Sequence, residues 1–259
     1  MALLQEHGGK ARLLAGGTDL IIRLRDGTMR PEVVIDVKGI PEIAPSIAVD
    51  GGVVRISAGT TMTEIHDSSV VTGWYPALAE AARFVGSVQI RNRATLVGNQ
   101  CNASPAADTA PPLLVYDASL VIAGPGGQRH LKLNDFFVRS GVTQLGVGEL
   151  VTAIELPVPA GRVGSAFQRR TRRRGHDLAS VTLAVSVDES GATRFAFGSM
   201  GPRPWLFESV AGEPPWDEWF SEAKPSPTSM RAGSDYRQAM LRVLTDRALS
   251  AARARLSAG

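Results

Sequence analysis

Cysteine is almost absent from this 259-residue sequence, in which Cys101 is the single example. One thiol excludes an internal disulfide, and iron–sulfur clusters and structural zinc sites need several sulfur ligands. The histidines lie far apart and show no metal-ligand spacing: His7, His66, His130 and His176. We therefore expect no metal site in this chain, so any metal chemistry must come from elsewhere.

Long apolar runs are also missing. No stretch reaches the length of about 20 apolar residues that a membrane-spanning helix requires. The first residues, MALLQEHGGKARLL, lack the basic flank, the apolar stretch and the cleavage site of a signal peptide. These absences predict a cytoplasmic protein without membrane insertion.

The net positive charge is small for this length, but it is unevenly placed. The net charge is +3, and the run QRRTRRR occupies residues 168–174. The run has no second basic segment of similar density and no interleaved aromatic residues for base stacking. We therefore expect no nucleic-acid partner, and we interpret the run as a solvated strand face or as a surface for an acidic partner or a cofactor phosphate.

The composition, with 44% hydrophobic and 20% charged residues, predicts a globular protein, and the strand and helix patterns that follow predict the α+β class. ARLLAGG, TDLIIRLRDG and EVVIDVKG predict a strand, a helix and a second buried strand, which together form a small βαβ unit. In this helix Leu20, Ile21 and Leu24 form an apolar face, with Thr18 placed to cap the start and Gly27 to cap the end.

A second α/β unit is expected at residues 51–158, after a first unit at residues 1–50. VVRISAG predicts a strand, and Thr61-x-x-Glu64 is a capping box that predicts a helix start. YPALAEAARFV predicts a second helix, SLVIAGPGGQRHLKL a hairpin, and ELVTAIELPVP a closing strand. The proline-rich connection that follows predicts a domain boundary.

The third expected unit is residues 162–259. SAFQRRT, LASVTLAVSVDE and ATRFAFGSM predict consecutive strands of an antiparallel sheet. Residues 211–233 are rich in helix breakers and predict an extended connection. The chain then predicts a long amphipathic helix capped by Ser234. Its expected apolar stripe is Tyr236, Met240, Val243, Leu244 and Ala248.

Two loops carry glycine in a suggestive setting, Ala15-Gly16-Gly17-Thr18-Asp19 and Thr95-Leu96-Val97-Gly98-Asn99. Each is either an ordinary turn or an anion site, because glycine lets backbone N–H groups converge and a helix start adds a partial positive charge. Two such loops can clasp a pyrophosphate. No G-x-G-x-x-G follows a strand here, which disfavours a Rossmann-type nicotinamide site.

Four motifs in fixed order carry a family resemblance: AGGTDL, TLVGNQCNASPAADTAPPLL, RRTRRRGHDLASVTLAVSV and SDYRQAMLRVLTDRAL. The chain resembles the FAD-binding medium subunit of molybdenum hydroxylases, the family of xanthine dehydrogenase and carbon monoxide dehydrogenase. The resemblance implies a two-part FAD-binding domain of the PCMH/vanillyl-alcohol-oxidase type, followed by a C-terminal antiparallel sheet with helices.

The resemblance also implies which residues bind FAD. The pyrophosphate would be held by the backbone of Leu14, Ala15, Gly16, Gly17, Thr18, Asp19, Leu20, Thr95, Gly98 and Asn99. Ser104 and Asp108 would contact the ribityl chain or the ADP part. Leu150 would pack on the isoalloxazine ring with Arg169, or Gln168 in another register, near it. Asp177 matches the acidic residue of the family's D-x-A segment.

The implied function is electron transfer through FAD. A large molybdopterin subunit would oxidise the substrate, and a small subunit with two [2Fe–2S] clusters would pass electrons to this flavin and on to an external acceptor. A dimer of heterotrimers is the expected assembly, and no catalytic residue is expected in this chain.

Two alternatives stay open. A free-standing FAD-dependent oxidase or reductase is disfavoured, since no residues remain for a substrate-covering domain. A degenerate scaffold without FAD is suggested by Val97, which stands where the family usually has glycine.

Overall fold

The structure is a computed structural model that describes residues 1–173, 175–210 and 212–258. Three positions of the sequence predictions lie outside the described residues: Arg174 of the basic run, Ala211 of the expected connection, and Gly259 of the expected third unit. Among the helices that are described, none combines the length and the apolar character needed to cross a bilayer.

The N-terminal segment forms the predicted βαβ unit. Its strands β1 and β2 pair in parallel, with Ala11 opposite Val33 and Leu14 opposite Asp36. The elements of this segment are α1 (Ala2–His7), the 3-10 turn η1 (Gly8–Lys10), β1 (Ala11–Leu14), α2 (Leu20–Arg25) and β2 (Val33–Asp36).

Details of α2 and β2 differ from the sequence predictions. Asp19 is the N-cap residue of α2 and makes no side-chain cap bond, so Thr18 does not cap this helix, and α2 ends at Arg25 with Asp26 as its C-cap. No residue of α2 is buried, and β2 is only half-buried. The reason is that β1 and β2 form a separate sheet of two strands, which offers the helix little surface to cover.

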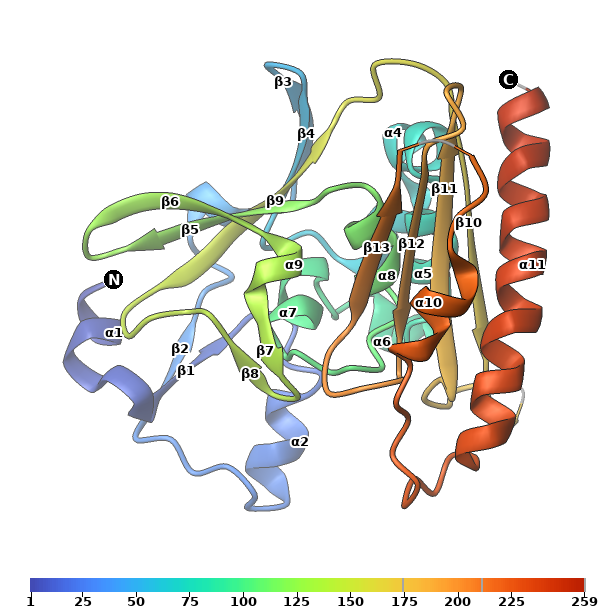
Figure 1. The fold of residues 1–259 in the computed structure, drawn as a ribbon. Coiled ribbons are helices and arrows are strands. Elements are labelled where there is room, and N and C mark those ends of the chain that lie inside the picture. The colour runs from blue at the N-terminus through green and yellow to red at the C-terminus, as the bar shows by residue number, and fades with distance from the viewer. Residues whose placement is uncertain (174, 211, 259) are drawn as a thin grey trace.

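The second sheet has the order β3-β4-β9-β5-β6, and all of its pairs are antiparallel. The last of these strands in the sequence, β9, therefore lies at the centre between β4 and β5 (Figure 1). The strands are β3 (Ile47–Asp50), β4 (Val53–Ser57), β5 (Ser119–Gly124), β6 (Gly127–Lys132) and β9 (Leu150–Pro157). The predicted β5–β6 hairpin is confirmed.

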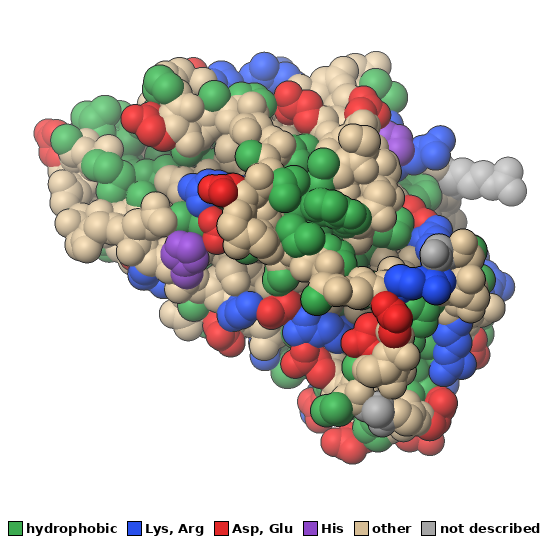
Figure 2. Space-filling model, turned by 90° about the horizontal axis from the view of Figure 1, so that it is seen from above, with side chains coloured by type: hydrophobic (Ala, Val, Ile, Leu, Met, Phe, Trp, Pro, Cys, Tyr) green, Lys and Arg blue, Asp and Glu red, His purple; other side chains and the backbone are tan. Residues whose placement is uncertain are grey.

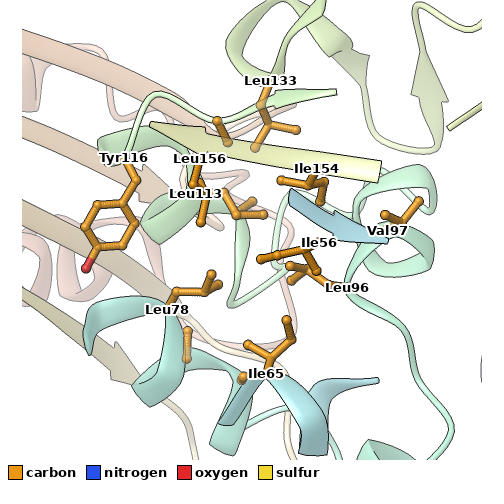
Figure 3. Packing of buried hydrophobic residues seen from close by; sticks show 14 of the residues in the cluster. Ile56, Ile65, Leu78, Leu96, Val97, Leu113, Tyr116, Leu133, Ile154 and Leu156 are labelled. Carbon is orange, nitrogen blue, oxygen red and sulfur yellow. The ribbon is translucent and has the colours of Figure 1, made fainter. Parts of the chain in front are cut away.

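Short elements precede and connect these strands, namely a 3-10 turn, several helices and a second two-stranded sheet. They are η2 (Pro41–Ile43), α3 (Met62–Asp67), α4 (Ser69–Trp74), α5 (Pro76–Arg83), α6 (Val88–Arg91), α7 (Leu96–Cys101), α8 (Ala110–Val115), α9 (Leu133–Phe136), β7 (Phe137–Arg139) and β8 (Val142–Thr143). The predicted capping box is present, since Thr61 Oγ1 accepts from Glu64 N and Thr61 N donates to Glu64 Oε2. Figure 3 shows the core that these helices form with the sheet.

The C-terminal sheet has the order β10-β11-β12-β13 and is antiparallel throughout, which confirms the α+β fold with a C-terminal antiparallel sheet. Its elements are β10 (Val163–Arg170), β11 (Val181–Asp188), β12 (Thr193–Gly198), β13 (Trp205–Ser209), α10 (Trp216–Ser221) and α11 (Ser234–Ala258). Helix α11 packs on β10 and β11, while α5 and α8 contact the same sheet (Figure 1).

The long helix is confirmed, and so is part of its predicted stripe, because Leu244 and Ala248 are buried and Met240 packs against the same core. The prediction is wrong for Tyr236 and Val243, which are 44% and 41% exposed. The buried face is formed by Arg237, Leu241, Leu244, Thr245, Ala248 and Ala252. Arg237 and Thr245 are polar, so an apolar pattern could not reveal all of this face. Ser234 is the first residue of α11 and not its cap.

Residues 211–233 are not wholly extended, because they contain α10. In this helix Trp216 packs edge-on against Phe195, and Trp219 stacks on the same ring. Phe207 also stacks on Trp219. Burial of these large rings stabilises a short helix in a segment whose prolines disfavour a longer one.

Charges of both signs are mixed on the face that Figure 2 shows, where red and blue side chains lie next to one another around a hydrophobic group. Ion pairs across strands occur in the described part of the chain, for example Arg55 with Glu155 at 2.6 Å. Such half-exposed pairs contribute about 0–1 kcal/mol each, so they act mainly on solubility and strand register.

Candidate functional site

The two glycine loops lie side by side. Gly16 packs so closely on the backbone that precedes Thr95 that an added Cβ atom would be 2.0 Å from the carbonyl oxygen of Arg93 and 3.0 Å from Cα of Ala94. No residue with a side chain fits at this approach. The sequence predicted that both loops bind one ligand, and the structure brings them together.

A second contact joins the helices that follow the loops. Arg23 of α2 donates a hydrogen bond from Nη2 to Oδ1 of Asn102, just after α7, at 2.8 Å. The second loop is also held from behind, because Leu96 N donates to the carbonyl of Thr60 and Met62 N to that of Ala94. Backbone hydrogen bonds therefore hold the second loop, and a side-chain hydrogen bond links the residue after α7 to the helix that follows the first loop.

The first loop presents unpaired backbone donors. Within the described residues, the N–H groups of Gly16, Gly17, Thr18, Asp19 and Leu20 donate no hydrogen bond to another part of the chain. Gly17 has φ of 75°, a left-handed conformation that glycine adopts without strain. A run of free N–H groups of this kind can bind an oxyanion.

The second loop uses its donors differently. Thr95 is the N-cap of α7, and its Oγ1 accepts a hydrogen bond from Gly98 N at 3.0 Å. Glycine is needed there because an added Cβ atom would lie 2.7 Å from Thr95 Oγ1. Val97 is buried in the same core cluster as Leu96 and Ile56 (Figure 3), so its side chain points away from the loop surface.

The side chain of Asn99 is oriented by two buried residues that the sequence analysis did not single out. Thr109 Oγ1 donates to Asn99 Oδ1 at 2.7 Å, and Gln100 Nε2 donates to Thr109 Oγ1 at 2.8 Å. Gln100 and Thr109 are both fully buried. Polar residues inside the small-residue stretch 94–114 are the signal that could have identified this network.

A buried ion pair lies in the same region. Arg169 Nη1 is 3.0 Å from Asp108 Oδ2, and the two side chains are 9% and 10% exposed. Arg169 also donates to the carbonyls of Phe84 and Asp177, and its guanidinium lies 5.5 Å from the centre of the Phe84 ring. Among the described residues Asp108 Oδ1 and Arg169 Nε have no partner, although both atoms are buried.

Burial raises the pKa of Asp108 to about 7 from 3.8, while the positive charge of Arg169 opposes this shift. Removal of a carboxylate from water disfavours its charged form, and a single ion pair offsets only part of this cost. Asp108 is therefore a group whose charge depends on its immediate surroundings.

Asp177 is close to this pair but interacts mainly with Arg172. Its carboxylate accepts from Arg172 Nη2 at 3.1 Å and Nε at 3.3 Å, and this interaction holds the pKa of Asp177 below its usual range. Its backbone carbonyl accepts from Arg169 at 2.6 Å. The structure thus brings Asp108, Arg169 and Asp177 together, and Arg172 is a further partner of Asp177 that the sequence analysis did not name.

Ser104 has a local contact, whereas Leu150 packs on residues that are distant in the sequence. Ser104 Oγ accepts from Ala106 N at 3.3 Å in a tight turn. Leu150, at the start of β9, is buried in a small cluster with Leu4 and Ala11. This cluster supports β1, the strand that leads into the first glycine loop.

Asp108 gives the fold an expected dependence on pH. Its pKa is raised in the folded protein, so between about pH 4 and pH 7 the folded chain holds a proton that the unfolded chain has released, and stability falls as pH rises. Asp108→Asn mimics the protonated form. Urea unfolding should show that this variant gains stability relative to the unchanged protein between about pH 5 and pH 8. If the difference in unfolding free energy between the two proteins is the same at about pH 5 and about pH 8, the raised pKa of Asp108 is contradicted.

Comparison with known proteins identifies the class. Residues 1–159 match the family model described as FAD binding domain in molybdopterin dehydrogenase. The chain belongs to this family, and it is accordingly a flavoprotein component of a molybdopterin-dependent oxidoreductase.

Individual relatives agree with this assignment. The chain is 35% identical to the xanthine dehydrogenase FAD-binding subunit of Escherichia coli O157:H7, over 75% of this chain and 68% of that protein. It is 31% identical to the carbon monoxide dehydrogenase medium chain of Hydrogenophaga pseudoflava, over 98% of this chain and 93% of that protein. A solved structure of the Hydrogenophaga pseudoflava carbon monoxide dehydrogenase superimposes with a TM-score of 0.91 over the same shares.

The described residues fit a bound FAD. The free N–H groups of the first loop are donors for a pyrophosphate, which carries no proton that would need an acceptor. The buried and unpartnered atoms of Asp108 and Arg169 need a hydrogen-bonding partner, which a polyhydroxylated ligand can provide. Unpaired donors thus occur in the first glycine loop, and unpaired buried polar atoms occur at the ion pair of Asp108. Asp108 is the residue next to Thr109, which binds Asn99 of the second loop.

Proposed function

We propose that this chain is the FAD-binding electron-transfer subunit of a heteromeric molybdenum hydroxylase. It would pass electrons from [2Fe–2S] clusters of a partner subunit through FAD to an external acceptor. The observation that supports this most strongly is the run of free N–H groups at Gly16 to Leu20 beside the second glycine loop.

Each part of the site has a role in this proposal. The backbone of the first loop, including Leu14 and Ala15, and the residues Thr95, Gly98 and Asn99 would hold the pyrophosphate. Ser104 and Asp108 would contact the ribityl chain or the ADP part, and Leu150, Arg169 and Asp177 would lie toward the ring. FAD, when bound, supplies the redox chemistry, whereas the chain supplies position and charge.

The buried ion pair would orient the polar part of the ligand. Arg169 is held at three points, by Asp108 and by the carbonyls of Phe84 and Asp177, so its charge is fixed in place. A fixed positive charge in a region of low dielectric stabilises negative charge nearby more strongly than an exposed one. We infer that Arg169 stabilises the negative charge that accumulates when the site is reduced.

The partners in this proposal are a large molybdopterin-binding subunit and a small subunit with two [2Fe–2S] clusters, assembled as a dimer of heterotrimers. In support, the relatives are named FAD-binding subunits or medium chains of dehydrogenases. We propose the division of the chain into residues 1–50, 51–158 and 162–259, and a cytoplasmic location.

The orientation of Val97 favours FAD binding over a degenerate scaffold. A valine that projected from the loop would block the approach of a phosphate. This side chain is instead 5% exposed and packs in the core.

We expect the purified complex to contain FAD that is held without a covalent bond. The chain has only one cysteine, and burial raises its pKa to about 12, so it is a poor nucleophile for flavin attachment. Acid precipitation should leave a yellow supernatant that contains FAD in about equal amount to the chain. A colourless protein in a complex that retains its other cofactors would favour the scaffold.

A further inference from the structure

A cavity of about 510 Å³ lies between the C-terminal sheet and the segment that joins α10 to α11. Part of its lining comes from the loops around the sheet, namely Pro105, Ser140 and Ser199. The other part carries the cations Lys224, Arg231 and Arg237. Among the described residues no aspartate or glutamate lines it. Its volume is in the range of small-molecule sites.

Arg237 is the central feature of this lining. It is only 3% exposed, and Nε donates to the carbonyl of Ser180 at 2.9 Å. Within the described chain the hydrogen bond to Ser180 uses Nε, so the terminal nitrogens stay available to the cavity, and no carboxylate pairs with Arg237. A buried guanidinium without a negative partner is unfavourable, so an anion in the cavity would stabilise it.

Arg231 adds a second positive charge close to the first. The pKa of Arg237 is lowered by burial and, to a smaller degree, by the charge of Arg231. In the part of the chain that the structure describes, Arg231 forms no ion pair, and Lys224 has only a long contact of 3.7 Å with exposed Glu222. The cavity therefore concentrates positive charge that the protein itself does not neutralise.

The cavity lies next to the candidate FAD site, but its lining does not include the backbone donors of the glycine loops. Pro105 follows Ser104 directly, and its carbonyl accepts a hydrogen bond from Ser199 N at 2.6 Å. On the opposite side Arg172, the partner of Asp177, donates to the carbonyl of Met230 in the cavity wall. None of the residues of the two glycine loops lines this cavity.

We propose that this cavity is a second ligand site, which binds a small molecule carrying phosphate groups while FAD occupies the neighbouring site. Phosphate fits this lining because guanidinium groups bind its oxygens through paired hydrogen bonds, and more than one cation faces the same space. The site goes beyond the proposed FAD site, and only its proximity to the cofactor depends on the proposed function.

The experiment is a calorimetric titration of the FAD-loaded protein with inorganic pyrophosphate at low ionic strength, with the flavin content of every sample measured separately. We expect saturable binding. Arg231→Gln should weaken it about tenfold, the equivalent of about 1.4 kcal/mol for one lost charged contact. Arg247→Gln removes an exposed arginine of α11 that does not line the cavity, so it should leave the affinity unchanged.

Three outcomes would overturn the proposal. One is the absence of pyrophosphate binding by protein that is fully loaded with FAD. Another is an equal loss of affinity in Arg231→Gln and Arg247→Gln, which would indicate general attraction by surface charge. The third is loss of FAD from Arg231→Gln together with no pyrophosphate binding, because the cavity would then belong to the FAD site. A protein without flavin contradicts the proposed function instead, so the two failures are distinguishable.

Discussion

Gly16→Ala is expected to separate the two glycine loops and to release FAD. The added methyl group would lie 2.0 Å from the carbonyl oxygen of Arg93, and backbone atoms cannot move aside as the end of a side chain can. Overpacking of this kind costs about 1–3 kcal/mol or more, and here the strain falls on the contact that aligns the loops. The flavin-to-protein absorbance ratio should fall strongly, while circular dichroism should still show a folded chain.

Matched glycine variants serve as controls. An alanine at Gly39 would meet no atom within 4 Å, so Gly39→Ala should retain FAD. Gly17→Ala is intermediate, since φ at Gly17 is 75° and the new group meets the ends of the Leu14 and Ile21 side chains. Full flavin content in Gly16→Ala would show that the contact with Arg93 does not matter for the cofactor.

The second large effect is expected for Arg169→Met. This change leaves Asp108 buried without its counter-charge, and removal of one partner of a buried pair costs about 3–5 kcal/mol. The loss should be smaller at acidic pH, because a protonated Asp108 needs no counter-charge and burial already raises its pKa to about 7. Urea unfolding at acidic and alkaline pH measures the loss of stability in Arg169→Met and its dependence on pH.

Two further variants separate charge from packing. Arg173→Gln alters an exposed arginine whose hydrogen bond, to the carbonyl of His176, is 3.3 Å long, so it should change stability by no more than about 0.5 kcal/mol. Adding Asp108→Asn to Arg169→Met should restore part of the lost stability. If the double variant is no more stable than Arg169→Met, the unpaired carboxylate is not the cause of the loss.

The same comparison tests the proposed role in electron transfer. Neutralising Arg169 in the assembled complex should slow reduction of the flavin, while Arg173→Gln should not. Rapid-mixing absorbance with the substrate of the complex can follow the iron–sulfur and flavin bands separately. Equal and negligible effects of both changes would mean that the basic run is only a solvated strand edge.

Local features of this fold could be predicted from the sequence. The capping box of Thr61 and Glu64 and the β5–β6 hairpin depend on residues that are close along the chain. The glycine loops could be predicted because glycine allows the backbone conformations and close approaches that an anion site needs. The order of the C-terminal strands β10 to β12 followed because consecutive antiparallel strands usually pair.

Features that depend on distant residues could not be predicted from these patterns. Helix α10 exists because its tryptophans reach the ring of Phe195. The contact of Gly16 with Arg93 joins residues that are far apart in the sequence. The ion pair of Arg172 with Asp177 depends on the geometry of the loop between them. The site residues Gln100 and Thr109 were missed because a buried polar network has no periodic signature.

The central place of β9 has a consequence for how the protein is made. Until residue 157 has left the ribosome, the five-stranded sheet exists only as the hairpins β3–β4 and β5–β6, each with an open edge. Open edges pair readily with other chains, and synthesis at about 5–20 residues per second leaves them open for seconds. Arrival of β9 covers the inner edges of β4 and β5 at once, so the sheet of the part that carries the glycine loops is completed in a single step, before the C-terminal sheet has been synthesised.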